Sequence, residues 1–239
     1  NNMSFLILVR HGQSVWNLEN RFTGWVDVEL TKNGESEAEK AGLLIKEKNI
    51  EINFYYSSLQ LRANNTLKII QKILNDKKNF VKAWQLNERH YGALTGLNKI
   101  ELKKKIGEKK VHEFRRSWDI KPDPLNKESL YHPINIKVYK DVPKEVIPDT
   151  ESLKDTYERV SKYFEKEIKK KLYDNNILIS AHGNSIRALC KKMFNLDNNQ
   201  ISNLEIPTGN PLIIELNKDL EIIKSEYLDK ERAKSLLIF

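Results

Sequence analysis

The 239-residue chain contains a single cysteine, Cys190, and so it cannot form an internal disulfide. One unpaired thiol is typical of proteins from a reducing compartment, which indicates the cytoplasm. No apolar run approaches the roughly 20 residues that a membrane span needs, so a membrane protein is excluded. The opening Asn1-Asn2-Met3 also lacks the charged start and apolar core of a signal peptide. We interpret Asn1 and Asn2 as residues left by cloning before a native Met3, and not as a targeting sequence.

Several catalytic motifs are absent as well. The chain has no G-x-x-x-x-G-K-[ST] phosphate loop, no G-x-S-x-G serine elbow, and no H-E-x-x-H or C-x-x-C pair. With one cysteine, a thiolate cage for a metal is excluded too. The sequence therefore predicts no metal site, and other side chains must supply the chemistry.

Basic residues are in excess, since 41 Lys and Arg against 33 Asp and Glu give a net charge of +8. Such an excess fits nucleic acid, an anionic membrane surface or small anionic substrates. The basic runs at 103–105 and 169–171 lie in helical patterns without interleaved aromatic residues, which is typical of solvated helix faces. We therefore expect a small anionic substrate and neither a nucleic-acid nor a membrane partner.

Apolar runs of strand length alternate with segments of helical period. This pattern predicts one α/β domain over 1–239, with a mostly parallel central sheet and helices on both faces. The predicted strands are 5–9, 54–56, 81–86, 177–181 and 212–216. The predicted helices are 32–48, 62–74, 98–106, 108–118, 150–172 and one from about 185, with Thr31, Asn98 and Thr150 as N-terminal caps. Five of the seven prolines fall within 119–149, an irregular segment that we interpret as lid-like.

Polar residues directly follow the predicted strands. They are Arg10-His11-Gly12 after the first, Ser57-Ser58 and Arg62 after the second, Asn87-Glu88-Arg89-His90 after the third, and His182-Gly183-Asn184 after the fourth. Ligands of open α/β sheets bind outside the carboxyl ends of the strands, so one shared site is predicted there. A lone histidine at a strand end is more often just hydrogen-bonded. Two of them in matching His-Gly context favour a joint site.

Six cations are candidates to face this site: Arg10, Arg62, Arg89, Lys99, Arg115 and Arg116. Guanidinium forks match phosphate oxygens, and an unpaired cluster would cost stability, so the cluster predicts a dianionic ligand. For any single arginine, a salt bridge to a glutamate is the alternative. Neighbouring cations should lower the pKa of His11 below about 6.5 and keep the imidazole neutral and nucleophilic. The residues thus predict a phosphoryl group carried on His11. The same cations would make Glu88 a poor acid unless burial or a bound phosphate offsets them.

Longer motifs give a family resemblance. Leu8-Val-Arg-His-Gly-Gln-Ser-Val-Trp-Asn17 and Asn20-Arg-Phe-Thr-Gly-Trp25 resemble the signature of the cofactor-dependent phosphoglycerate mutases of the histidine phosphatase superfamily. The resemblance continues, in the family's order and over nearly the whole chain, through 86–99, Arg115-Arg116, 181–189 and 206–209.

The resemblance implies an isomerase of glycolysis and gluconeogenesis that interconverts 3-phosphoglycerate and 2-phosphoglycerate. It implies a phosphohistidine primed by 2,3-bisphosphoglycerate, no metal, and a homodimer or homotetramer. The implied catalytic residues are His11 as phosphohistidine, Glu88 as proton donor and acceptor, and His182, Arg10 and Arg62 as its helpers. The implied substrate-binding residues are Ser14, Asn17, Thr23, Gly24, Arg89, Tyr91, Lys99, Arg115, Arg116, Gly183 and Asn184.

The chain departs from the family pattern at three places. Gln13 stands where glutamate is common, and Leu61 precedes Arg62 where lysine is frequent. The sequence ends at Phe239, where many relatives continue into a lysine-rich tail over the site. A short tail would admit water and raise hydrolysis.

Three rival functions remain open at this point. A bisphosphoglycerate synthase/phosphatase shares the phosphohistidine, but its red-cell form has glycine in place of Ser14. A fructose-2,6-bisphosphatase-like or broad phosphatase lacks the Phe-Thr-Gly-Trp segment. A non-catalytic basic binding module is disfavoured, because Arg10, His11, Glu88 and His182 are all present together.

Overall fold

The computed structural model describes residues 3–233. The interpretation of Asn1 and Asn2, and that of the tail ending at Phe239, therefore concern residues outside the described range. The described chain forms an α/β fold around one six-stranded sheet, in the order β3-β2-β4-β1-β5-β6. The strands are β1 (Ser4–Arg10), β2 (Phe54–Ser57), β3 (Val81–Lys82), β4 (Ile177–Ala181), β5 (Leu212–Leu216) and β6 (Ile222–Tyr227). The first four are mutually parallel, and β5 alone runs against them, pairing antiparallel with β1 and β6, so the predicted mostly parallel sheet is confirmed.

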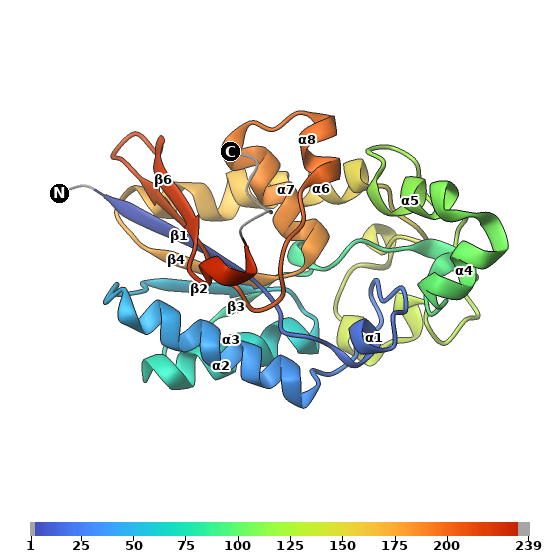
Figure 1. Cartoon of the computed structure of the whole chain (residues 1–239), viewed down its shortest axis with the longest axis horizontal. Helices are drawn as coiled ribbons and strands as arrows, with labels where there is room; N and C mark the ends of the chain where they lie inside the picture. The colour runs from blue at the N-terminus through green and yellow to red at the C-terminus, as the bar shows by residue number, and fades with distance from the viewer. Residues whose placement is uncertain (1–2, 234–239) are drawn as a thin grey trace.

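Helices cover both faces of the sheet, as predicted. They are α1 (Val15–Leu18), α2 (Lys32–Glu47), α3 (Leu61–Leu74), α4 (Lys99–Ile106), α5 (Glu108–Arg116), α6 (Leu153–Tyr163), α7 (Gly183–Phe194) and α8 (Asn198–Asn203). Figure 1 shows α2 and α3 on one face and α6, α7 and α8 on the other, with α1, α4 and α5 beyond one end of the sheet. No helix within 3–233 is long and apolar enough to cross a bilayer.

The core has two halves because β1 is buried on both faces. Successive side chains of a strand point to opposite sides. Leu6 and Leu8 accordingly join the cluster under α6 and α7, while Ile7 and Val9 join the cluster under α2 and α3. An unbroken apolar run thus becomes the centre of a covered parallel sheet.

The cap prediction for α2 is confirmed. The Thr31 hydroxyl accepts a hydrogen bond from the Gly34 amide, and Ala38, Ala41 and Ile45 are buried at helical spacing. Asn98 likewise caps α4, where its side chain accepts from the amides of Ile100 and Glu101.

Several elements of the structure differ from the prediction. The predicted strand 81–86 pairs only at Val81–Lys82 and then turns into a 3₁₀ helix, Trp84–Leu86. Strand β6 was not predicted; it lies at the sheet edge, where a half-exposed strand has no apolar run to mark it. The helix after Asn184 begins earlier than predicted, at Gly183, with His182 at its N-cap.

The predicted helix 150–172 is also revised. Ser152, not Thr150, caps α6, because the Thr150 hydroxyl donates to the carbonyl of Pro122 instead. Beyond Tyr163 the helix widens into a π-turn (Phe164–Ile168) and then tightens into a 3₁₀ turn (Lys169–Tyr173). The apolar residues Val160, Phe164, Ile168 and Leu172 recur every four positions, a longer period than the 3.6 residues per turn of an α-helix. The wider π-turn keeps these side chains on one face in spite of the longer spacing.

The irregular segment 119–149 carries three short 3₁₀ turns (Pro133–Asn135, Lys137–Tyr139 and Lys144–Val146) and is anchored from within. Tyr139 is buried against Trp25 and donates its hydroxyl proton to the Trp25 carbonyl. The side-chain amide of Gln60 donates from Nε2 to the same hydroxyl at 3.0 Å. This anchor places the segment beside the loop that follows α1.

Gly34 supplies a test of how tightly the first turn of α2 packs on the loop after β1. A Cβ at Gly34 would lie 2.0 Å from the carbonyl oxygen of Gln13, and both groups belong to backbone that cannot rotate away. We expect Gly34→Ala to lower the free energy of unfolding by about 2 kcal/mol in urea denaturation, because overpacked backbone must shift. The matched control Ser36→Ala, on an exposed position of the same helix, should stay within about 0.5 kcal/mol of wild type. Equal stability of the two variants would contradict this close contact.

Candidate active site

The two histidines that follow strands lie side by side. His11 leaves β1 and His182 leaves β4, and these strands are direct neighbours in the sheet. The amide of His11 donates to the carbonyl of Ala181 at 3.0 Å, which extends the pairing into both loops. The two rings have centroids 5.0 Å apart at a tilt of 60°, and both are buried. The predicted joint site at the carboxyl ends of the strands therefore exists.

The imidazole of His11 has a defined tautomer. Nδ1 lies 2.6 Å from the carbonyl oxygen of Gly12, which can only accept, so Nδ1 carries the proton. Nε2 is then an unprotonated nitrogen, and Nε of Arg62 donates to it at 3.3 Å. The pKa of His11 is held well below 6.5, first by burial and then by the charges of Arg62 and Arg10. The predicted direction of this pKa shift agrees with the structure, although burial, which the sequence argument left out, is the larger cause.

Backbone carbonyls fix Arg62, which lies in the first turn of α3. Its Nη1 donates to the carbonyl of Val26 at 2.9 Å and its Nη2 to that of Gly24 at 3.0 Å. Leu61 takes part through its backbone, since its amide donates to the carboxylate of Asp27 at 2.7 Å. No carboxylate is bonded to the Arg62 guanidinium within the described chain, and its charge stays available next to His11.

His182 is held by Ser58. The Ser58 hydroxyl lies 2.7 Å from Nε2 of His182 and accepts a hydrogen bond from the backbone amide of Gln60 at 3.1 Å. In the part of the chain that the structure describes, Nδ1 of His182 is buried without a hydrogen-bond partner. Burial, followed by the charge of Arg62, lowers the pKa of His182 well below 6.5. If the Ser58 hydroxyl donates its hydrogen bond to Nε2, the proton of the neutral ring lies on Nδ1.

Glu88 brings the one carboxylate of the cavity wall, and it is 9% exposed. Its Oε1 accepts from the amide of Arg89 at 2.7 Å and from that of Asn184 at 3.2 Å. Its own amide donates to Oε1 of Gln60 at 2.8 Å. Glu88 therefore reaches the site even though the strand predicted to carry it ends at Lys82.

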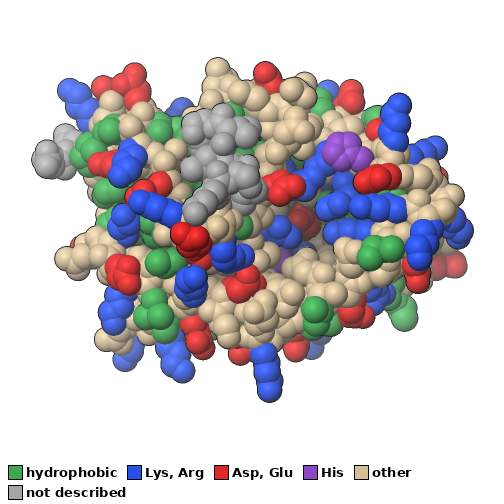
Figure 2. Space-filling view, viewed as in Figure 1, with side chains coloured by type: hydrophobic (Ala, Val, Ile, Leu, Met, Phe, Trp, Pro, Cys, Tyr) green, Lys and Arg blue, Asp and Glu red, His purple; other side chains and the backbone are tan. Residues whose placement is uncertain are grey.

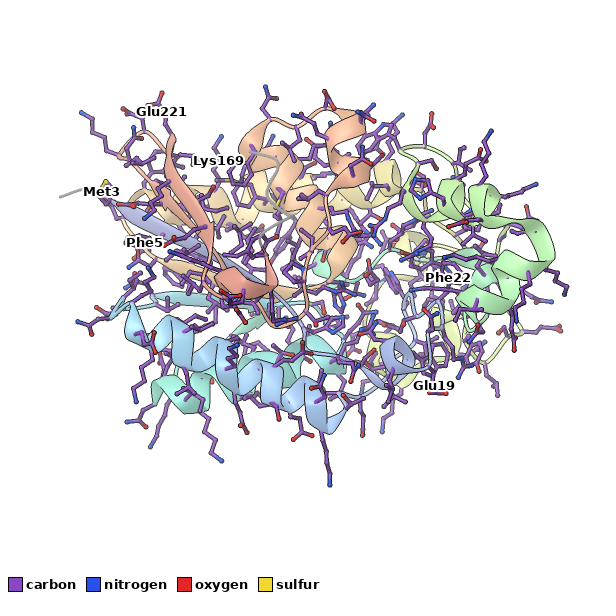
Figure 3. The ribbon with its side chains drawn as sticks, in the orientation of Figure 1. Met3, Phe5, Glu19, Phe22, Lys169 and Glu221 are labelled. Atoms are coloured by element: carbon purple, nitrogen blue, oxygen red, sulfur yellow. The ribbon has the colours of Figure 1, made fainter. Side chains whose placement is uncertain are left out.

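Cations line the cavity beside Glu88. Six of them share its wall: Arg10, Arg21, Lys99, Arg115, Arg116 and Arg187. The uncharged lining residues are Asn17, Thr23, Gly24, Tyr91, Gly183 and Asn184. Figure 2 shows Lys and Arg side chains gathered around a recess on this face, and Figure 3 places Phe22, one residue before Thr23, at the same end of the molecule. Burial, reinforced by Arg115 and Arg10, lowers the pKa of Lys99 to about 7.

Two predicted ligands do not line this cavity. The guanidinium of Arg89 donates to the carbonyls of Glu151, Arg115 and Ile120 and lies 4.9 Å from the ring centroid of Tyr91. Ser14 is buried at the N-cap of α1, where its hydroxyl accepts from the Asn17 amide. His11, His182 and Arg62 do not line the cavity either but lie beside it, where Arg62 is bonded to the carbonyl of the lining residue Gly24. The other predicted residues all line the cavity.

Two cations in the cavity wall were missed by the sequence argument. Arg187 is buried, with its Nε donating to the carbonyl of Leu204 at 2.6 Å and its Nη1 to Oδ1 of Asn184 at 3.0 Å. Burial and the charge of Arg116 lower the pKa of Arg187 to about 9. Arg21 donates to the carbonyl of Gly96 and lies over the ring of Trp16. Both residues lie inside the quoted motifs, and Arg187 follows Gly183 by one helical turn, a spacing that could have identified it.

Within residues 3–233, no group of three or more His, Cys, Asp or Glu side chains is placed to hold a metal ion. Cys190 is buried in α7, and burial raises the pKa of its thiol to about 12. The thiol is therefore unreactive near neutral pH.

Comparison with known proteins agrees with this geometry. The family model of the histidine phosphatase superfamily (branch 1) matches residues 6–135 and 131–225. The 2,3-bisphosphoglycerate-dependent phosphoglycerate mutase of Pelagibacter ubique (strain HTCC1062) is 68% identical over 99% of this chain and 100% of its own length. The protein of the same name from Borrelia garinii is 49% identical over 97% of this chain and 95% of its own.

A solved structure shows the same fold at low identity. A mycobacterial glucosyl-3-phosphoglycerate phosphatase, 19% identical, superposes with a TM-score of 0.66 over 94% of this chain and 97% of its own. Fold, motifs and full-length relatives agree, and the chain belongs to the histidine phosphatase superfamily and, within it, to the family of 2,3-bisphosphoglycerate-dependent phosphoglycerate mutases.

Proposed function

We propose that this chain interconverts 3-phosphoglycerate and 2-phosphoglycerate, in glycolysis and gluconeogenesis, by carrying a phosphoryl group on Nε2 of His11. One observation carries the proposal: a neutral, tautomerically fixed imidazole lies beside Arg62, next to a cavity whose wall has six cations and one carboxylate. A pocket with that charge favours a small substrate with two anionic groups. The names of the full-length relatives support the same reaction.

Each catalytic residue has its own role in the proposed reaction. Phosphorylated His11 transfers the phosphoryl group from Nε2 to the free hydroxyl of the bound monophosphoglycerate, whose proton Glu88 removes, and 2,3-bisphosphoglycerate forms. Nε2 of His11 then attacks the other phosphate of this intermediate, the bond from that phosphorus to the substrate oxygen breaks, and Glu88 returns the proton to the departing oxygen. Arg62 and His182 stabilise the charge on the transferring group in both steps. Proton and phosphoryl group are thus both conserved over the cycle.

The cavity wall supplies the substrate contacts in this proposal. Arg10, Lys99, Arg115 and Arg116 would bind phosphate and carboxylate oxygens by charge, with Asn17, Thr23, Gly24, Tyr91, Gly183 and Asn184 donating further hydrogen bonds. Arg89 and Ser14 would act indirectly, by holding Tyr91 and Asn17 in place.

The priming donor in this proposal is 2,3-bisphosphoglycerate, and no metal takes part. Two phosphates and a carboxylate on a small molecule match the cationic wall. We further propose a homodimer or homotetramer in the cytoplasm, without nucleic-acid or membrane partners, in which the segment 119–149 closes over the bound substrate as a lid.

Turnover in the presence of a chelator tests the reaction. Purified protein given 3-phosphoglycerate and a catalytic amount of 2,3-bisphosphoglycerate should form 2-phosphoglycerate at the same rate with and without EDTA, because the arginines supply the charge that a metal would otherwise supply. The product can be quantified by ³¹P NMR of quenched samples, which needs no metal-dependent coupling enzyme. Release of inorganic phosphate alone would favour the phosphatase rivals, and salt-sensitive nucleic-acid binding without turnover would favour the binding module.

Labelling identifies the nucleophile. With ³²P-labelled 2,3-bisphosphoglycerate, wild type should acquire acid-labile label, while His11→Ala should acquire none and lose at least ~10³-fold in turnover. Cys190→Ala is the control and should keep activity within a few-fold, since the thiol is buried and protonated. Label retained by His11→Ala would show that another residue carries the phosphoryl group.

The pH dependence of labelling tests the environment of His11. Because the pKa of His11 lies well below 6.5, the imidazole stays unprotonated as the pH falls through 6.5, and labelling should slow only at lower pH. Arg62→Gln removes one of the two cations that lower this pKa, so its acid limb should move to higher pH. The ionisation of the phosphoryl donor is common to both proteins and cancels in the comparison. Coincident limbs would mean that Arg62 does not tune the imidazole.

A further inference from the structure

We infer that Arg159, together with Glu151, is a positioning residue for the reaction: the pair holds the segment 85–90 so that the Glu88 carboxyl stays in place for proton transfer. Arg159 lies on α6 and is not part of the cavity wall. The inference rests on the proposed role of Glu88 as proton donor and acceptor.

The segment that carries Glu88 has no strand partner. Pairing of β3 ends at Lys82, a single 3₁₀ turn follows, and the chain then runs on without regular structure to Tyr91. Buried backbone carbonyls outside a ladder need other hydrogen-bond donors. Without them, the backbone of a buried proton donor would be free to shift.

Arg159 supplies those donors. Its Nη1 donates to the carbonyl oxygens of Gln85 at 2.8 Å and Asn87 at 3.0 Å. Its Nη2 donates to the carbonyl oxygen of Glu88 itself at 2.8 Å. One planar group therefore binds three carbonyls of the segment, including that of the residue it positions.

Glu151 orients that guanidinium and binds the segment from the other end. Nε and Nη2 of Arg159 donate to Oε2 and Oε1 of Glu151 at 2.8 and 2.9 Å, a bidentate pair. Oε1 also accepts from the His90 amide at 2.9 Å, and the Glu151 amide donates to the His90 carbonyl at 2.9 Å. Only 10% of the Arg159 side chain and 6% of the Glu151 side chain are exposed.

All five N–H groups of Arg159 are used in this way: two bind the carboxylate and three bind backbone carbonyls. A lysine at 159 would keep the charge but has three donors on one nitrogen, which cannot span this set. Arg159→Lys is therefore the informative variant, because the buried carboxylate of Glu151 keeps a cationic partner.

The expected defect is specific to steps that need a proton. A displaced Glu88 slows phosphoryl transfer to His11 when the leaving oxygen must be protonated, and has little effect when the leaving group is stable as an anion. Two donors for the same transfer separate these cases: labelled 2,3-bisphosphoglycerate, whose leaving alkoxide needs a proton, and p-nitrophenyl phosphate, whose phenolate does not. Single-turnover labelling follows the first, and the burst of p-nitrophenolate follows the second.

We expect Arg159→Lys and Glu151→Gln to slow labelling by 2,3-bisphosphoglycerate about 30-fold, with the concentration for half-maximal rate changed less than about threefold, and to leave the p-nitrophenolate burst within about threefold. Glu88→Gln should show the same selectivity and serves as the reference. Lys162→Met, at an exposed position on the same helix, is the matched control and should behave as wild type. Circular dichroism melting shows that each variant is folded.

The outcomes separate this inference from the proposed function. Equal slowing with both donors, or no slowing with either, would overturn the positioning role of the pair. Wild-type protein that becomes labelled but forms no 2-phosphoglycerate would overturn the proposed reaction alone, and the donor comparison would still decide the inference. Wild-type protein that takes no label from either donor would overturn both.

Discussion

The contact between Nε2 of His11 and Nε of Arg62 is the interaction on which the site depends. A buried imidazole beside a guanidinium cannot hold a second proton without placing two positive charges together in a medium of low polarity. Nδ1 keeps the ring's one proton and donates it in a hydrogen bond to the Gly12 carbonyl, so Nε2 is the nitrogen with a free lone pair. Burial, charge and tautomer thereby act on the same atom.

The arginines of the site are held mainly by backbone carbonyls. Arg62 donates to Gly24 and Val26, Arg10 to Ile206, and Arg187 to Leu204. Carbonyls fix the direction of a guanidinium but leave its net charge in place, whereas a carboxylate partner would cancel it. The cavity therefore stays positive until a dianion enters, and the lowered pKa of Lys99 reflects the same crowding of charge.

Glu88, the proposed acid–base group, is positioned in a different way. His11 and His182 follow paired strands, whose ladder places them directly, while Glu88 lies on a segment without a ladder. There the structure uses side chains to bind main chain: Gln60 on one side of Glu88 and the Arg159–Glu151 pair on the other. These contacts fix the backbone on either side of Glu88 where no strand pairing does so.

The sequence by itself determined the α/β class, the central strands, the caps at Thr31 and Asn98, and the His-Gly pairs at the strand ends, because these depend on local period and on residue type. It also contained the family motifs, and with them most of the cavity wall. Only the tertiary structure decided the tautomer of His11, the removal of Arg89 and Ser14 from the cavity wall, the presence there of Arg21 and Arg187, and the part of Arg159. Several of these depend on contacts between residues far apart in the sequence, such as Arg187 with the carbonyl of Leu204, 17 positions away, and Arg21 with that of Gly96, 75 positions away. Spacing along the chain does not record such contacts. Edge strand β6 was missed because its pairing with β5, and not a local apolar pattern, stabilises it.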